Sequence, residues 1–155
     1  MSTWTEVTGI IRCDWIPFST TIFGRFEEWD ERCKLLHKLF AEETSPHGSE
    51  GQYIRAIIND KTLEIDDLNT IALLGSLRDF TEEEINSQIK PWWENIMKSL
   101  PFVRQAVLSC TSSRKTHIFE KRISSDFDLY EPDCPLWSPD PGIIVHTTRE
   151  VSKKE

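Results

Sequence analysis

Hydrophobic residues recur in two stretches of the chain at the spacing of an α-helix. Within residues 25–42 the apolar positions are three or four residues apart, which places them on one helical face. They are Phe26, Trp29, Cys33, Leu36 and Phe40. A second face of this kind follows Thr81, where Thr81 and Glu84 have the spacing of a capping box, and it extends to Leu100. Pro91 interrupts it and is expected to kink the helix or to begin a second segment. The pattern therefore predicts two helices.

Shorter segments rich in β-branched and aromatic residues predict strands. These segments are residues 3–13, 53–58, 70–75, 103–110 and 115–122, with 142–148 returning as an edge strand. Residues 70–75 form an uninterrupted apolar run, which is typical of a buried central strand. The order of elements predicts an α+β fold. We expect a ferredoxin-like βαββαβ sheet with two helices on one face, extended by a further C-terminal hairpin strand.

Length and local composition predict one domain followed by an extension. A chain of 155 residues suits a single compact domain, which we assign to residues 1–123. Within the remaining residues 124–155, the stretch 124–142 contains five acids, no bases and four prolines. Such a composition forms no regular core element. We therefore expect an irregular, acidic and aromatic tail that is strapped to the domain.

The charge balance and the absence of targeting features limit the functional classes. The chain carries 18 basic and 26 acidic side chains, a net charge of −8. This excess of acid argues against direct nucleic-acid binding, which relies on clustered Lys and Arg. No apolar run approaches the roughly 20 residues of a membrane span. The N-terminus has no signal-peptide pattern, and the four cysteines include no CxxC pair. We therefore expect a cytoplasmic protein that has free thiols and contacts no membrane.

No group of residues has the spacing of a catalytic or metal site. Cys33 and His37 lie four positions apart on a predicted helix, but no second pair of ligands completes a metal site. A Cys–His nucleophile would need a third orienting group, which the sequence does not supply. The sequence thus predicts neither an enzyme nor a cofactor.

Two short motifs support a hypothesis of small-ligand binding. The loop Gly48, Ser49, Glu50 and Gly51 has two glycines whose neighbouring N–H groups can form an anion nest, and Arg55 follows it. Arg78 and Asp79 stand at a strand-to-helix junction, where a guanidinium can bind a phosphate through two hydrogen bonds. The structural alternatives are a plain connection and a local ion pair. The ligand in this hypothesis is a nucleotide or another phosphate.

Aromatic and acidic residues predict a protein-binding surface instead. Trp92 and Trp93 are adjacent on a predicted helix, so they are not expected to point inward together, and one of them suits an interface. Residues of the tail share this aromatic and acidic character: Asp126, Asp128, Tyr130, Glu131 and Trp137. Acid clusters can mimic the phosphates of nucleic acid, which predicts a partner protein with a basic surface. A homodimer is the other partner that we consider.

Three motifs carry a resemblance to a known group of proteins. They are the opening Thr3–Arg12 (TWTEVTGIIR), the loop Gly48–Gly51 (GSEG) and the strand end Gly75–Phe80 (GSLRDF). Over residues 3–120 the chain resembles short uncharacterised proteins encoded by tailed bacteriophages, although Ser76 stands where that group has an acid. The resemblance implies a phage-encoded protein in the host cytoplasm that binds and inhibits a host protein, for example a component of the host's defence machinery. Two functions therefore stay open: occlusion of a host protein, and capture of a phosphate ligand.

Overall fold

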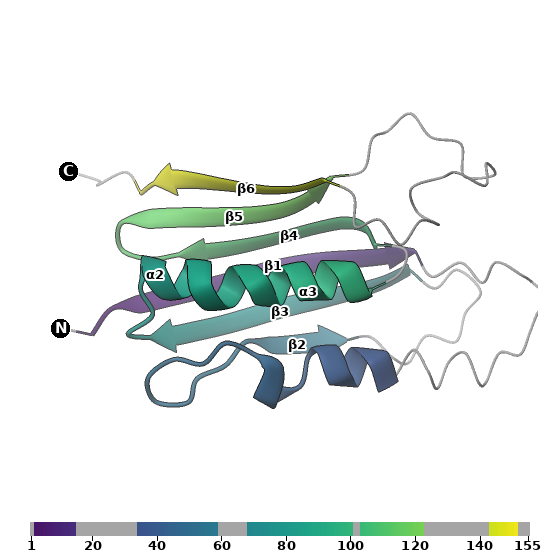
Figure 1. Ribbon diagram of the computed structural model, residues 1–155, viewed down its shortest axis with the longest axis horizontal. Helices are drawn as coiled ribbons and strands as arrows, with labels where there is room; N and C mark the ends of the chain where they lie inside the picture. Colours follow the sequence, from purple (N-terminus) through teal and green to yellow (C-terminus); the bar gives the residue numbers. More distant parts are fainter. Residues whose placement is uncertain (1, 15–33, 59–67, 101–102, 123–142, 152–155) are drawn as a thin grey trace, which may run out of the picture.

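The computed structural model describes residues 2–14, 34–58, 68–100, 103–122 and 143–151 (Figure 1). Within these ranges the chain forms one six-stranded sheet in the order β2-β3-β1-β4-β5-β6, and every neighbouring pair is antiparallel. The strands are β1 (Trp4–Asp14), β2 (Arg55–Ile58), β3 (Leu68–Arg78), β4 (Val103–Thr111), β5 (Lys115–Arg122) and β6 (Ile143–Glu150). The edge strand predicted at 142–148 is confirmed as β6, which pairs with β5 along its whole length.

A continuous helix of 18 residues crosses the sheet. It consists of α2 (Glu82–Glu84), a π-helical turn over Ile85–Ile89, and α3 (Lys90–Ser99). The predicted capping box is confirmed, since the Thr81 backbone N–H donates to the Glu84 carboxylate at 2.8 Å. The wide π turn comes directly before Pro91. The proline ring has no N–H and crowds the carbonyl of the preceding turn, so local widening lets the helix continue past it.

The prediction of a ferredoxin-like βαββαβ fold covered by two helices is wrong. The described structure is mostly sheet, with six strands and one helix of 18 residues. Of the predicted helix over 25–42, residues 34–39 are helical, and a short 3-10 turn, Glu42–Thr44, follows. The rest of that prediction up to residue 33 lies outside the described residues, as does the tail 124–142. Hydrophobic periodicity identified the strands, including the additional ones at the C-terminal side, but it did not show how much of the sheet helices would cover.

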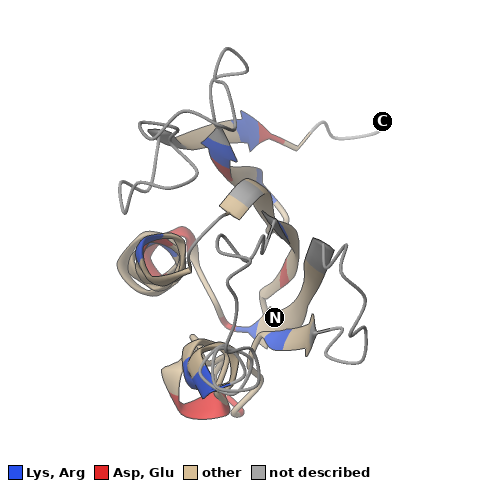
Figure 2. Cartoon of the chain, turned by 90° about the vertical axis from the view of Figure 1, so that its right-hand side faces the viewer, with Lys and Arg blue, Asp and Glu red and all other residues tan. Residues whose placement is uncertain are grey.

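The core lies between the helix and one face of the sheet. Buried strand residues alternate along the chain, as expected for an antiparallel sheet with one covered face: Val7, Ile11, Ile71, Leu73, Leu77, Ala106, Leu108 and Phe119. Figure 2 shows that the helical segments lie on the same side of the curved sheet. The opposite side is therefore called the helix-free face here.

Both adjacent tryptophans of α3 belong to this core. Trp92 is 8% exposed and Trp93 is fully buried, so the prediction that they cannot both turn inward is wrong. The apolar sector of the helix is wide enough to contain two positions about 100° apart, because Ile89, Trp92, Trp93 and Ile96 together span more than a single narrow stripe. Consequently neither indole is presented to a partner in this structure.

Candidate functional site

The helix-free face carries a row of exposed apolar side chains. Strand register places Ile57 beside Ala72, Ala72 beside Ile10, and Ile10 beside Val107, across four neighbouring strands. Leu74 lies on the same face of β3, two residues from Ala72. We call these five residues the apolar stripe. Its exposed fractions are high for large hydrophobic residues: 59% for Ile57, 53% for Ile10, 49% for Leu74 and 37% for Val107.

This stripe explains why the apolar run at 70–75 has no polar alternation. Ile71 and Leu73 point into the core, whereas Leu74 on the other face is half exposed. A strand in an antiparallel sheet with one solvated face normally places polar side chains outward. Among the described residues, five exposed large hydrophobics lie on strands, and all five lie on the helix-free face: Trp4, Ile10, Ile57, Leu74 and Val107. This face therefore has the character of a surface that is covered by something else.

A groove of about 590 Å³ adjoins the apolar stripe and shares Leu74 with it. Its polar walls come from β1, β3, the first residue of β2 and the segment before β2. The Arg55 guanidinium lies over the Tyr53 ring at 5.3 Å from the ring centroid, and the Ser76 hydroxyl donates to Oε1 of Glu6 at 2.7 Å. The groove thus combines apolar lining residues with one cation, Arg55, and two carboxylates, those of Glu6 and Glu50.

The residues predicted to bind a phosphate do gather near this groove. Glu50, Gly51 and Arg55 line it. Arg78 forms an ion pair with Glu50 and donates to the Ser2 hydroxyl from Nε at 3.0 Å and from Nη2 at 2.8 Å. The Ser49 hydroxyl donates to Oδ2 of Asp79 at 2.8 Å. The two motifs are therefore bonded to each other, and the Arg78 guanidinium is already occupied by protein groups.

The loop has no free backbone N–H groups for an anion nest. The N–H of Gly48 donates to the Gln52 carbonyl at 2.8 Å, and that of Ser49 donates to the Arg78 carbonyl at 3.0 Å. The N–H of Glu50 donates to Oε1 of Gln52 at 3.3 Å, and that of Gly51 donates to the Gly48 carbonyl at 3.1 Å. A phosphate would have to displace these bonds. The geometry thus favours the reading in which the loop is a connection that docks on the strand end.

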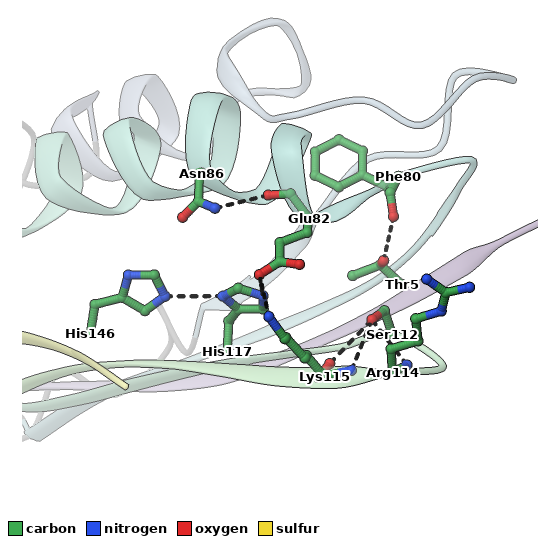
Figure 3. Close-up of polar contacts among 9 residues, drawn as sticks. All are labelled: Thr5, Phe80, Glu82, Asn86, Ser112, Arg114, Lys115, His117 and His146. Atoms are coloured by element: carbon green, nitrogen blue, oxygen red, sulfur yellow. Dashed lines mark hydrogen bonds and ion pairs between the residues drawn. The ribbon is translucent and has the colours of Figure 1, made fainter. Parts of the chain in front are cut away.

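A second cluster, which the sequence did not indicate, joins the helix start to β5 and β6 (Figure 3). Nδ1 of His117 and Nε2 of His146 lie 3.1 Å apart, and the His146 ring stacks on Phe119 with a centroid distance of 4.2 Å. His117 is only 1% exposed. Its Nε2 has no hydrogen-bond partner among the described residues, and it lies 3.8 Å from Oε1 of Glu82. Nζ of Lys115 donates to the same Glu82 oxygen at 3.0 Å.

Burial dominates the electrostatics of this pair. Loss of solvent lowers the pKa of His117, while the Glu82 charge opposes this and Lys115 adds to it. Burial also lowers the pKa of His146, and the charges of His117 and Lys90 lower it further. Both imidazoles are therefore neutral at pH 7. The two histidines are 29 residues apart, so only the pairing of β5 with β6 brings them together.

The remaining predicted candidates are the acidic and aromatic tail, the possible metal ligands and the cysteines. The tail residues Asp126, Asp128, Tyr130, Glu131 and Trp137 lie outside the described residues. Over the part of the chain that is described, no three potential ligands are grouped to hold a metal ion. Cys110 is a buried free thiol, and burial raises its pKa to about 12, so it is neither a thiolate nucleophile nor a metal ligand here.

Comparisons with known proteins do not extend this picture. Comparison with protein-family models, with curated proteins and with solved structures gives no match. No helix in the described ranges combines the length and the apolar character that crossing a membrane requires. Functional inference therefore rests on the apolar stripe, the groove beside it and the cluster around His117 and His146.

Proposed function

We propose that this protein is a non-enzymatic binding protein that docks a partner protein on its helix-free face. The observation that carries the proposal is the apolar stripe, in which Ile57, Ile10 and Val107 share one row across the sheet and stay exposed. Large exposed apolar surfaces are typical of interaction sites, because leaving them in water is unfavourable. The groove beside the stripe adds polar groups at its edge, as the rim of an interface usually does.

The partner that we propose is a host protein with a basic surface, which a phage-encoded protein binds and occludes. The net charge of −8 supports a basic partner, because a negatively charged protein attracts a positively charged one and so increases their association rate. Two exposed acids in the groove beside the apolar stripe, Glu6 and Glu50, contribute to this field. The phage and host assignments rest on the resemblance of the three motifs described above. In this proposal the acids steer the encounter, and the apolar stripe provides most of the affinity.

A pull-down with matched variants tests the proposal. The tagged protein is incubated with host lysate at low and moderate salt, and captured proteins are identified by mass spectrometry. The double variant Ile10→Thr, Ile57→Thr reduces the stripe while keeping β-branched residues in the strands. The control, Thr70→Ser with Thr147→Ser, changes two exposed positions of the same face outside the stripe.

We expect the wild type and the control to retain one partner that the stripe variant loses. Equal recovery by the stripe variant, or no partner at either salt concentration, would refute the proposal. Sedimentation of the purified protein identifies the competing occupant. A dimer that the stripe variant breaks would assign the face to a second copy of this chain and overturn the host-partner proposal.

The alternative function, binding of a nucleotide or another phosphate, has less support. The groove has a suitable size for a small molecule, and Arg55 faces it. However, the N–H groups of the loop 48–51 are used internally, and Arg78 is paired with Glu50. With Glu6 and Glu50 also in the lining, the groove has no excess of positive charge with which to attract a phosphate.

A further inference from the structure

The histidine pair connects the edge strand of the sheet to its neighbour through side chains. Within the described ranges, β6 is the last strand of the sheet, and its one neighbouring strand is β5. His146 of β6 contacts two side chains of β5, through the 3.1 Å contact with His117 and through the ring stack on Phe119. His117 in turn faces Glu82 at the start of the helix (Figure 3). A line of polar contacts therefore runs from the helix through β5 to β6.

The chemistry of the contact requires an asymmetric arrangement of protons. A hydrogen bond between two imidazoles needs an N–H on one ring and a lone pair on the other. A proton on Nε2 of His117 is favoured by the nearby Glu82 carboxylate, and Nδ1 of the same neutral ring is then the acceptor. The His146 Nε2–H accordingly donates to Nδ1 of His117. Neutral and singly protonated pairs can both keep this hydrogen bond, whereas a doubly protonated pair has no acceptor.

We propose that His117 and His146 form a pH-sensitive latch that holds β6 on the sheet and releases it when both rings are protonated. The doubly protonated state would place two positive charges about 3 Å apart in a partly buried site, where their repulsion is strong. The surrounding charges act in both directions: Glu82 favours a proton on His117, whereas Lys115 disfavours it and Lys90 disfavours a proton on His146. The cations on the packed elements are Lys90, Lys115 and Lys121, and the anions are Glu82 and Glu150. Glu82 is engaged by Lys115, so it does not fully balance a second proton.

Release of the latch would change what the sheet offers to other proteins. β5 would become the edge, with a row of backbone N–H and C=O groups free of their partners in β6. Such an edge can accept an extended segment of another chain by strand addition. The latch would therefore control a second binding mode, which is separate from the apolar stripe and independent of the function proposed for it.

Amide hydrogen exchange of the full-length wild type tests the latch. Exchange of β6 and of the opposite edge strand, β2, is measured from pH 7.5 to pH 5.0 and corrected for intrinsic exchange rates. The ratio of opening in β6 to opening in β2 should rise as the pH falls below 6.5, by up to tenfold per pH unit for each proton linked to opening. A ratio that stays constant over this range would overturn the proposal.

Three variants separate the latch from general acid sensitivity. His146→Phe keeps an aromatic ring for stacking on Phe119 but cannot titrate, so its β6 profile should be flat. His146→Lys places a permanent charge beside His117 and should open β6 at both ends of the range. His37→Gln removes an exposed histidine elsewhere and should behave as the wild type does. A His146→Phe profile that matches the wild type would refute the latch. If His146→Phe does not fold, the same comparison is made between the wild type and His117→Gln. The β6 profile of His117→Gln should then be flat, whereas the wild-type ratio should rise as the pH falls.

Discussion

Substitution of the two loop glycines by alanine distinguishes a structural loop from a ligand-binding one. A Cβ at Gly48 would lie 2.7 Å from the backbone nitrogen of Arg78 and 3.1 Å from its carbonyl oxygen. Neither atom can move without disturbing the strand end, because the Ser49 N–H is bonded to that carbonyl. A Cβ at Gly51 meets nothing within 4 Å, but the backbone there has φ of 82°. The two positions therefore test two different physical costs.

The expected magnitudes follow from these two environments. Gly48→Ala forces backbone apart in a closely packed junction, which typically costs about 1–3 kcal/mol. In Gly51→Ala the added methyl group clashes with nothing, so the cost comes only from holding alanine in the left-handed backbone conformation. This costs about 1 kcal/mol of unfolding free energy. We therefore expect Gly48→Ala to lower the free energy of unfolding more than Gly51→Ala does. It should also loosen the ion pair of Arg78 with Glu50, because the loop carries Glu50 against the strand.

Urea denaturation followed by circular dichroism measures the difference. Both variants should lower the urea midpoint, with Gly48→Ala lower than Gly51→Ala and with the slope m unchanged for each. A Gly48→Ala midpoint equal to or above that of Gly51→Ala would refute the reasoning, because the loop would then not be packed on the Arg78 backbone.

Three further outcomes are expected. Thr5→Val should lower the free energy of unfolding by about 1–3 kcal/mol, because the buried Thr5 hydroxyl donates to the Phe80 carbonyl at 2.7 Å and valine removes this donor. A urea midpoint equal to that of the wild type would contradict this expectation. Burial lowers the pKa of His117 and His146, so the unfolded chain binds more protons below pH 6.5. The urea midpoint should therefore be highest above pH 6.5 and fall as the pH drops below it, and a midpoint that rises on acidification would contradict the burial of the pair. A nucleotide panel should leave the melting temperature unchanged, whereas a nucleotide at 100 times its dissociation constant would add about 2.7 kcal/mol and revive the phosphate hypothesis.

The sequence was sufficient for elements whose signal is local. The strand predicted at 3–13 is observed as Trp4–Asp14, and the hairpin of 103–110 with 115–122 as Val103–Thr111 with Lys115–Arg122. The helix start at Thr81 was also predicted correctly, because a capping box depends on side chains three residues apart. Such features are determined by backbone preferences and by side-chain periodicity within a single segment.

The sequence also contained a sign of the candidate interface, but the spacing of apolar residues within one segment did not show that part of this segment is exposed. The apolar run at 70–75 predicts burial, and the core does cover Ile71 and Leu73. Only the position of the helix on one side of the sheet shows that Leu74 stays exposed. The prediction of two covering helices failed because it, too, depended on where helices lie on the sheet. Periodicity shows which side chains share a face of an element, but not whether another element covers that face.

The tertiary structure alone decided which residues meet across the sheet. Ile10, Ile57 and Val107 are distant in the sequence, and they share a row because β1 lies between β3 and β4. His117 and His146 were isolated histidines in the sequence, and they became a partly buried pair because β6 adds to β5 in one particular register. A shift of a strand by one residue would turn each of these side chains to the other face. Strand order and register depend on pairing between segments that are distant in the sequence. The sequence by itself therefore determined the strands, whereas the folded sheet determined the apolar stripe and the histidine pair.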